Sequence, residues 1–168
     1  MIKRSQPREH SAPLRRFGRY GPLFLWIAFI LYASSGEFSA ENSSRFVRPF
    51  LLWLFPKISE GQLAGVHFLT RKVSHLVEYA ILAFLARRVF AQSSQQFFRR
   101  SWFELSLILV ALCSFLDEFK QSYDPSRSAS ILDSLIDIIG GLTVLYLFRT
   151  YDRSTSRSGI PATGSRIT

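Results

Sequence analysis

The chain has 168 residues, of which 48% are hydrophobic and 15% aromatic, including 16 phenylalanines. This composition excludes a disordered chain, and the length argues for one folded unit and against a multidomain enzyme. Lysine and arginine outnumber aspartate and glutamate by 21 to 12, a charge balance that suits either a nucleic-acid binder or a protein at anionic lipid. The single cysteine, Cys113, excludes an intramolecular disulfide and a cysteine-based metal site.

The amino-terminal part combines a basic tail with an apolar stretch. Residues 1–19 are basic and contain two prolines, and we predict a disordered cytoplasmic tail. Residues 20–36 carry no charge and predict the first membrane helix, near the minimum length for a span. A signal peptide is the alternative, because small residues, Ala33 and Ser35, follow the apolar stretch. The long basic region and the apolar stretches that follow favour the membrane helix.

Three further apolar segments, each about eighteen residues long, predict three more membrane helices, at 73–90, 102–119 and 131–148. The uncharged cores of the last two are also short enough for buried helices of a soluble bundle. Between the first two spans, residues 45–56 crowd aromatic and aliphatic side chains between prolines and predict an interfacial helix. Residues 150–168 lack periodicity and predict a disordered cytoplasmic tail.

These elements predict an all-α fold: an integral membrane bundle of four transmembrane helices, with an interfacial segment between helices 1 and 2. Its orientation follows from the basic residues, which are in excess on the cytoplasmic side. Fourteen lie in the two tails and the 87–100 connection, and seven lie on the other side. Both termini are therefore expected in the cytoplasm. Because the basic residues alternate with spans, the sequence argues against a nucleic-acid partner.

With this orientation, the ionisable residues of three spans fall on the exoplasmic side of the membrane. Helical spacing groups them by face: His75 with Glu78, Asp117 and Glu118 with Gln121, and Asp133 with Asp137. Ionisable groups at membrane depth usually face a bundle interior or a watery cavity, which predicts one shared pocket. Residues within one turn of a helix end, such as Glu118, can instead mark only the membrane boundary.

Two chemistries fit such a pocket. A histidine with several carboxylates could bind a divalent cation. Alternatively, Arg127, with Arg71 or Lys72, could pair with the acids and fix the helix ends. A hydrolase or transferase acting on a lipid would use His75 or Glu78 as the general base and Arg127 for an anionic headgroup. The sequence contains no nucleophile elbow, phosphate loop or zinc-helix motif, so catalysis stays open and no cofactor is indicated.

Several of these motifs together resemble the VanZ-like family of small four-helix membrane proteins. They are Arg71-Lys72, His75-Leu-Val-Glu-Tyr79, Asp117-Glu-Phe-Lys-Gln121, Ser126-Arg127-Ser128 with Asp133, and Gly140-Gly141. One departure is Asp137, where the family commonly has asparagine. The resemblance implies a VanZ-like membrane domain over residues 20–149 in a bacterial plasma membrane. It also implies cell-envelope phenotypes, such as the teicoplanin resistance of the namesake, without a settled reaction.

The preferred hypothesis is a pocket that recognises an envelope lipid or a glycopeptide-like ligand. A lipid-active membrane enzyme is the second hypothesis, and a purely structural membrane subunit is the third. Membrane lipid is the expected partner, and the sequence indicates neither the ligand nor the oligomeric state. The residues predicted to line the pocket are His75, Glu78, Tyr79, Asp117, Glu118, Gln121, Arg127, Asp133 and Asp137.

Overall fold

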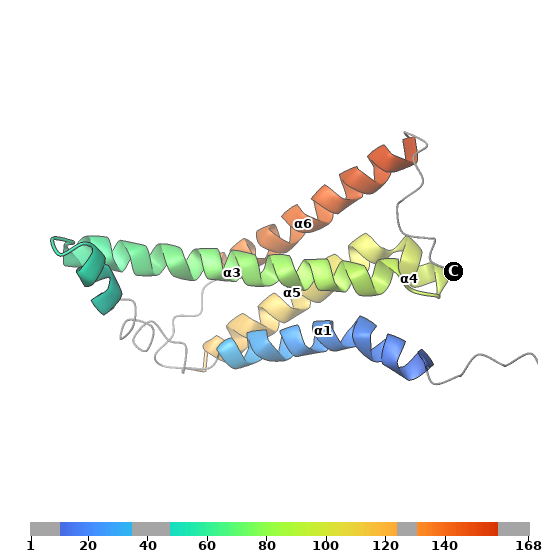
Figure 1. The fold of residues 1–168 in the computed structure, drawn as a ribbon, viewed down its shortest axis with the longest axis horizontal. Helices are drawn as coiled ribbons and strands as arrows, with labels where there is room; N and C mark the ends of the chain where they lie inside the picture. Colours follow the sequence, from blue (N-terminus) through green and yellow to red (C-terminus); the bar gives the residue numbers. More distant parts are fainter. Residues whose placement is uncertain (1–10, 35–47, 124–130, 158–168) are drawn as a thin grey trace, which may run out of the picture.

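The computed structural model describes residues 11–34, 48–123 and 131–157. Helices are the only regular secondary structure among these residues, which confirms the all-α prediction (Figure 1). The helices are α1 (Ser11–Ala33), a short helix over residues 48–54, α3 (Glu60–Ala91), α4 (Gln96–Arg100), α5 (Trp102–Gln121) and α6 (Ile131–Arg157).

The longest helix, α3, begins at Glu60, well before the predicted start of the second span at Val73. Its start is fixed by a capping box, in which the Gln62 backbone N–H donates to the Ser59 hydroxyl at 3.3 Å. In return, the Ser59 backbone N–H donates to the Gln62 side-chain oxygen at 3.0 Å. This reciprocal cap satisfies two amides that the helix itself leaves without partners. Residues 60–72, which the sequence places before the second predicted span, therefore belong to α3.

The first helix, α1, begins inside the segment predicted to be a disordered tail. Arg19 Nη2 donates to the Val89 carbonyl oxygen of α3 at 2.8 Å. Pro22, inside α1, has no N–H to offer the Gly18 carbonyl one turn earlier. Arg88 Nη2 donates to that carbonyl at 3.2 Å instead. Contacts with the carboxyl end of α3 therefore hold the basic turns of α1 in a helix.

The last helix, α6, continues to Arg157, beyond the predicted end of the fourth span. Arg87 Nη2 donates to both carboxylate oxygens of Asp152, at 2.9 and 3.0 Å. The same guanidinium lies over the Phe148 ring, 4.1 Å from its centroid. These contacts attach the polar end of α6 to α3. The helix therefore continues beyond residue 148, where the predicted fourth span ends.

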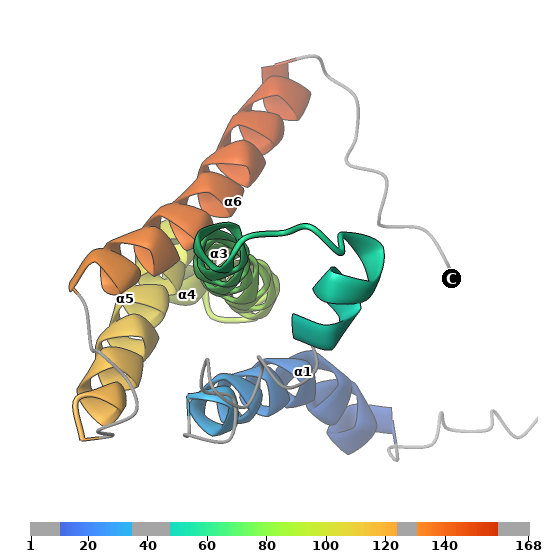
Figure 2. The ribbon, with the colours of Figure 1, turned by 90° about the vertical axis from the view of Figure 1, so that its left-hand side faces the viewer.

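The central element of the bundle is α3, which packs against α1, α5 and α6 (Figure 2). In Figure 1 its amino-terminal turns and the short helix at 48–54 extend beyond the ends of the other helices. The core residues come from all four long helices and are Leu23, Ile30, Tyr79, Leu82, Ala83, Ala86, Val89, Val110, Cys113 and Leu145. The fold thus assembles three helices around one long helix.

Two glycines of α6 allow the close approach of its neighbours. A Cβ atom at Gly140 would lie 2.6 Å from the Leu76 carbonyl oxygen of α3. A Cβ atom at Gly141 would lie 2.8 Å from a methyl group of Val110 on α5. Because the first obstacle is backbone, which cannot rotate away, Gly140 sets the distance between α3 and α6.

Besides its apolar core, the bundle buries several acids and exposes many large apolar side chains. Asp117, Asp133 and Asp137 are no more than 2% exposed, whereas Phe115 and Leu147 on the outer faces of α5 and α6 are more than 60% exposed. Large apolar side chains cover the outer surface of each long helix. The bundle therefore keeps polar groups inside and presents apolar groups to its surroundings.

Length and composition identify one helix among the described residues as able to cross a membrane, Ile131–Thr155. A second apolar helix, Phe17–Ala33, is shorter. The apolar stretches of α3 and α5 contain charged residues, including Glu78 and Asp117. These two criteria alone therefore do not establish the four predicted spans.

Candidate functional site

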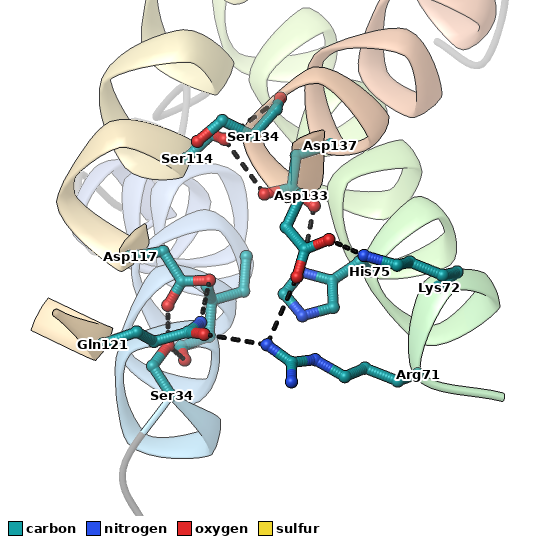
Figure 3. Close-up of polar contacts among 11 residues, drawn as sticks. Ser34, Arg71, Lys72, His75, Ser114, Asp117, Gln121, Asp133, Ser134 and Asp137 are labelled. Carbon is teal, nitrogen blue, oxygen red and sulfur yellow. Dashed lines mark hydrogen bonds and ion pairs between the residues drawn. The ribbon is translucent and has the colours of Figure 1, made fainter. Parts of the chain in front are cut away.

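Most of the buried polar side chains gather where α1 and α5 end, α6 begins and α3 passes through its middle turns (Figure 3). Helical spacing accounts for the grouping on α3, α5 and α6, because each of these helices contributes residues three or four positions apart on one face. We call these side chains, together with two partly exposed cations beside them, the polar centre. It consists of Ser34 at the end of α1, Arg71, Lys72 and His75 on α3, Ser114, Asp117 and Gln121 on α5, and Asp133 and Asp137 on α6.

Asp137 joins three helices through its two carboxylate oxygens. One oxygen lies 3.0 Å from Nδ1 of His75 on α3. The other accepts a hydrogen bond of 2.9 Å from the Ser114 hydroxyl on α5. Asp137 is completely buried and His75 nearly so, and both lie next to the close contact at Gly140. The spacing of α3 and α6 thus brings an acid and an imidazole into contact.

Asp117 links α5 to the end of α1. Its carboxylate accepts hydrogen bonds from the Ser34 hydroxyl and, at 3.1 Å, from the Gln121 side-chain amide. The Gln121 oxygen in turn accepts a hydrogen bond of 3.2 Å from Arg71 on α3. These hydrogen bonds join α1, α5 and α3, and Arg71 extends them to α6 by donating to Asp133.

Asp133 carries the ion pairs of the polar centre. Arg71 lies 3.2 Å from one carboxylate oxygen, and the Lys72 ammonium contacts the other. Asp133 is buried, whereas the side chains of Arg71 and Lys72 are 32% and 19% exposed. The polar centre thus has two cations at its rim and carboxylates in its interior.

The two interior carboxylates, Asp117 and Asp137, contact no lysine or arginine among the described residues. Their partners are hydroxyl groups, one amide and the imidazole of His75. One ligand atom each from His75, Asp117 and Asp137 lie within 4.8 Å of one another. The interior therefore contains two carboxyl groups and one imidazole, without a lysine or arginine among the described residues in contact with either acid.

The remaining predicted site residues are Tyr79, Glu118, Glu78 and Arg127. Tyr79, one turn after His75 on α3, is completely buried. Glu118 is buried near the end of α5. Glu78 interacts electrostatically with His75, but it lines a cleft between α1 and α3 and is only half-buried. Arg127 lies outside the described residues, so its predicted role stays a prediction.

The cleft beside Glu78 has a volume of about 520 Å³. Trp26 of α1 lines this cleft and donates its indole N–H to the Glu78 carbonyl oxygen at 2.9 Å. A larger groove, of about 810 Å³, lies between the short helix at 48–54 and the first turns of α3. Leu69 lines both, so the two hollows adjoin along α3.

Four residues of the polar centre were absent from the set predicted to line the pocket: Ser34, Arg71, Lys72 and Ser114. Arg71 and Lys72 precede His75 by four and three positions, and this spacing indicates a shared face. Both are among the partners expected for the acids, and the ion pairs with Asp133 confirm that pairing. Nothing in the sequence relates Ser34 to Asp117, because they are far apart along the chain.

The family of the chain follows from comparison with known proteins. The sequence model described as VanZ/LLP1 matches residues 20–152, which include all the long helices apart from the ends of α1 and α6. No curated protein matches the chain, and neither does any solved structure. The match covers most of the sequence and every residue of the polar centre, and it confirms the resemblance noted from the motifs. The chain therefore belongs to the VanZ/LLP1 family.

Proposed function

We propose that the protein is a multi-pass plasma-membrane protein in which α1, α3, α5 and α6 cross the bilayer. Its buried acids and exposed apolar side chains support this, because lipid favours an apolar outer surface and polar side chains that face the bundle interior. The two ends of the bundle also differ. Arg19 lies in the first half of α1 and Arg87 and Arg88 near the end of α3, so their contacts lie opposite the polar centre, which is where α1 ends. An arginine-rich cytoplasmic end and an exoplasmic polar centre follow from this difference.

We further propose that the polar centre recognises an envelope lipid with an anionic headgroup. The observation that supports this most directly is the position of Arg71. It lies at the rim of the polar centre, and two residues that share its helix face, Ser74 and Glu78, line the apolar cleft between α1 and α3. A headgroup at Arg71 would allow the lipid chain to enter that cleft.

The donors of Arg71 suit this role. Its hydrogen bonds to Gln121 and Asp133 both come from Nη2, so within the described part of the chain Nε and Nη1 have no acceptor. The N–H groups on Nε and Nη1 can therefore donate to phosphate or carboxylate oxygens of a ligand. Asp133 is also paired with Lys72, so Arg71 can turn toward a ligand without leaving that acid alone.

The cleft suits an acyl chain. Its lining is largely apolar and includes Trp26, Phe29, Val77 and Ile81. Its volume of about 520 Å³ falls within the usual range for sites that hold small ligands. The cleft opens between two proposed membrane helices, where a lipid could enter from the bilayer without crossing water.

The experiment measures lipid retention by the full chain. The protein is purified in detergent, incubated with phosphatidylglycerol or phosphatidylcholine, and analysed by native mass spectrometry. We expect retention of phosphatidylglycerol and its loss in Arg71→Gln. The matched control is Arg99→Gln, an exposed arginine near the opposite end of α3. Equal retention of both lipids, or full retention by Arg71→Gln, would contradict the proposal.

The same variants address the antibiotic phenotype. If lipid recognition produces it, a strain that expresses the wild-type protein should be less susceptible to teicoplanin than one that expresses Arg71→Gln. Membrane abundance is measured alongside by immunoblot. Loss of the phenotype at normal abundance supports recognition by Arg71.

A purely structural role is the second candidate, and the ion pairs of Asp133 favour it, because they join α3 to α6. If the role is purely structural, Arg71→Gln should lower the membrane abundance of the protein, and lipid retention per folded molecule should stay unchanged. The two readouts therefore separate recognition from scaffolding.

A further inference from the structure

We infer that His75, Asp117 and Asp137 form a binding site for one divalent transition-metal ion. The site lies deeper than Arg71 and uses none of the cations at the rim. The inference goes beyond the proposed lipid recognition and does not depend on it, since an ion could bind whether or not a lipid occupies the cleft. It rests on geometry, on a buried hydroxyl without a partner, and on charge.

The geometry is close to that of a metal site. One ligand atom each from His75, Asp117 and Asp137 lie within 4.8 Å of one another, and all three residues are buried. In a tetrahedral site, ligand atoms about 2.1 Å from the ion lie roughly 3.4 Å from each other. Side-chain rotations that move the ligand atoms by up to about 1 Å would therefore bring all three to bonding distance.

The buried hydroxyl of Tyr79 is the independent observation. Tyr79 is 0% exposed and stands one turn after His75 on α3. Its hydroxyl has no hydrogen-bond partner in the described part of the protein. The acids with which it interacts most strongly are Asp117 and Asp137. A buried hydroxyl without a partner is costly, and an ion or an ion-bound water between these acids would supply one.

Charge also favours a cation at this position. Asp117 and Asp137 lie close together without a lysine or arginine from the described segments in contact with either. Two ionised carboxylates in such a position repel each other unless a proton or a cation intervenes. The bound ion would offset this repulsion in the same way as Arg71 and Lys72 do for Asp133.

The surrounding hydrogen bonds can hold the ligands in place. Ser114 donates to Asp137, while Ser34 and Gln121 donate to Asp117. Such outer contacts orient the carboxylates that coordinate a metal and are typical of metal sites in proteins. The donor set therefore consists of two oriented carboxylates and one imidazole, with the Tyr79 hydroxyl nearby.

The ligand types indicate which metal ions should bind most tightly. An imidazole with carboxylates suits Zn²⁺, Mn²⁺ or Fe²⁺, whereas Ca²⁺ requires six to eight oxygen ligands. Three protein ligands also leave room for water or a fourth group on the ion. We therefore expect Zn²⁺ and Mn²⁺ to bind and Ca²⁺ to bind weakly.

The test measures metal binding by the full chain, purified in detergent without a polyhistidine tag and stripped with a chelator. Calorimetry and metal analysis should give one Zn²⁺ or Mn²⁺ per chain. Asp137→Asn and Asp117→Asn should each weaken binding by more than about tenfold. The matched control is His67→Gln, which removes a histidine from the same helix two turns earlier and should leave binding unchanged.

X-ray absorption of the zinc-loaded wild-type protein provides a readout that does not depend on the folding of any variant. We expect one imidazole and otherwise oxygen ligands around the ion. Absence of stoichiometric binding by the wild-type protein would overturn the inference. It would equally be overturned by a spectrum without an imidazole ligand, or by loss of the ion in His67→Gln but not in the aspartate variants.

Discussion

His75 and Asp137 lie 62 positions apart in the sequence, yet their side chains meet at 3.0 Å between α3 and α6. Asp137 also accepts a hydrogen bond from Ser114, so one carboxylate connects three helices. Its contact with His75 is possible because Gly140, one turn further along α6, lies directly against the backbone of α3. The packing of the bundle and the chemistry of the polar centre are therefore coupled at this point.

The first prediction concerns Asp137→Ala. This substitution removes the partner of the buried His75 imidazole and the closer of the two acceptors of the buried Ser114 hydroxyl. We expect a loss of about 1–3 kcal/mol in the free energy of unfolding. Asp137→Asn retains an acceptor oxygen and should lose less. Thermal unfolding in detergent measures both variants, with Glu60→Gln at the exposed start of α3 as the control. Equal stability of all three would argue against a structural contribution from this carboxylate.

The second prediction concerns Gly140→Ala. The added Cβ would lie 2.6 Å from the Leu76 carbonyl oxygen, so α6 must move away from α3. Overpacking of this kind costs about 1–3 kcal/mol. Gly61→Ala is the control, because nothing lies within 4 Å of a Cβ at that helical position. We expect a lower melting temperature for the first variant and an equal or higher one for the second. The reverse order would show that α3 and α6 are not in close contact.

The third prediction concerns the cations around Asp133. Replacing both Arg71 and Lys72 with glutamine removes every ion pair that Asp133 forms with the described residues. A buried carboxylate left without its cations costs about 3–5 kcal/mol. We expect the double variant to accumulate poorly in the membrane, and Asp133→Asn in the same chain to restore it. If the double variant accumulates normally, Asp133 does not depend on these two partners.

The fourth prediction concerns topology. Cysteines introduced at Lys57 and Ser94, both exposed, report on opposite ends of α3. In a Cys113→Ala chain, a membrane-impermeant maleimide applied to intact cells should label position 57 and leave position 94 unlabelled. Permeabilised cells serve as the control and should label both. Labelling of position 94 from outside would reverse the proposed orientation.

Several features could be predicted from the sequence because they depend on local chemistry. Apolar stretches predicted the long helices, and residues three or four positions apart predicted which acids share a face. This spacing and the common membrane depth of the three spans led us to expect His75, Asp117, Gln121, Asp133 and Asp137 near one another, and the structure brings them together. Helix ends were less predictable. The cap at Ser59 starts α3 early, and arginine contacts extend α1 and α6 beyond their uncharged stretches.

Only the tertiary structure decided which neighbour each helix face meets. Residues 75 and 78 differ by three positions, so their side chains point about 60° apart around α3. This divergence directs His75 toward α6, while Glu78 lines the cleft beside α1. Likewise, the sequence predicted cations for the acids, but the rotation and spacing of α3 and α6 decided that Arg71 and Lys72 both meet Asp133. Helical periodicity determines the faces of one helix, whereas contacts between helices depend on packing at positions such as Gly140, far from their partners in sequence.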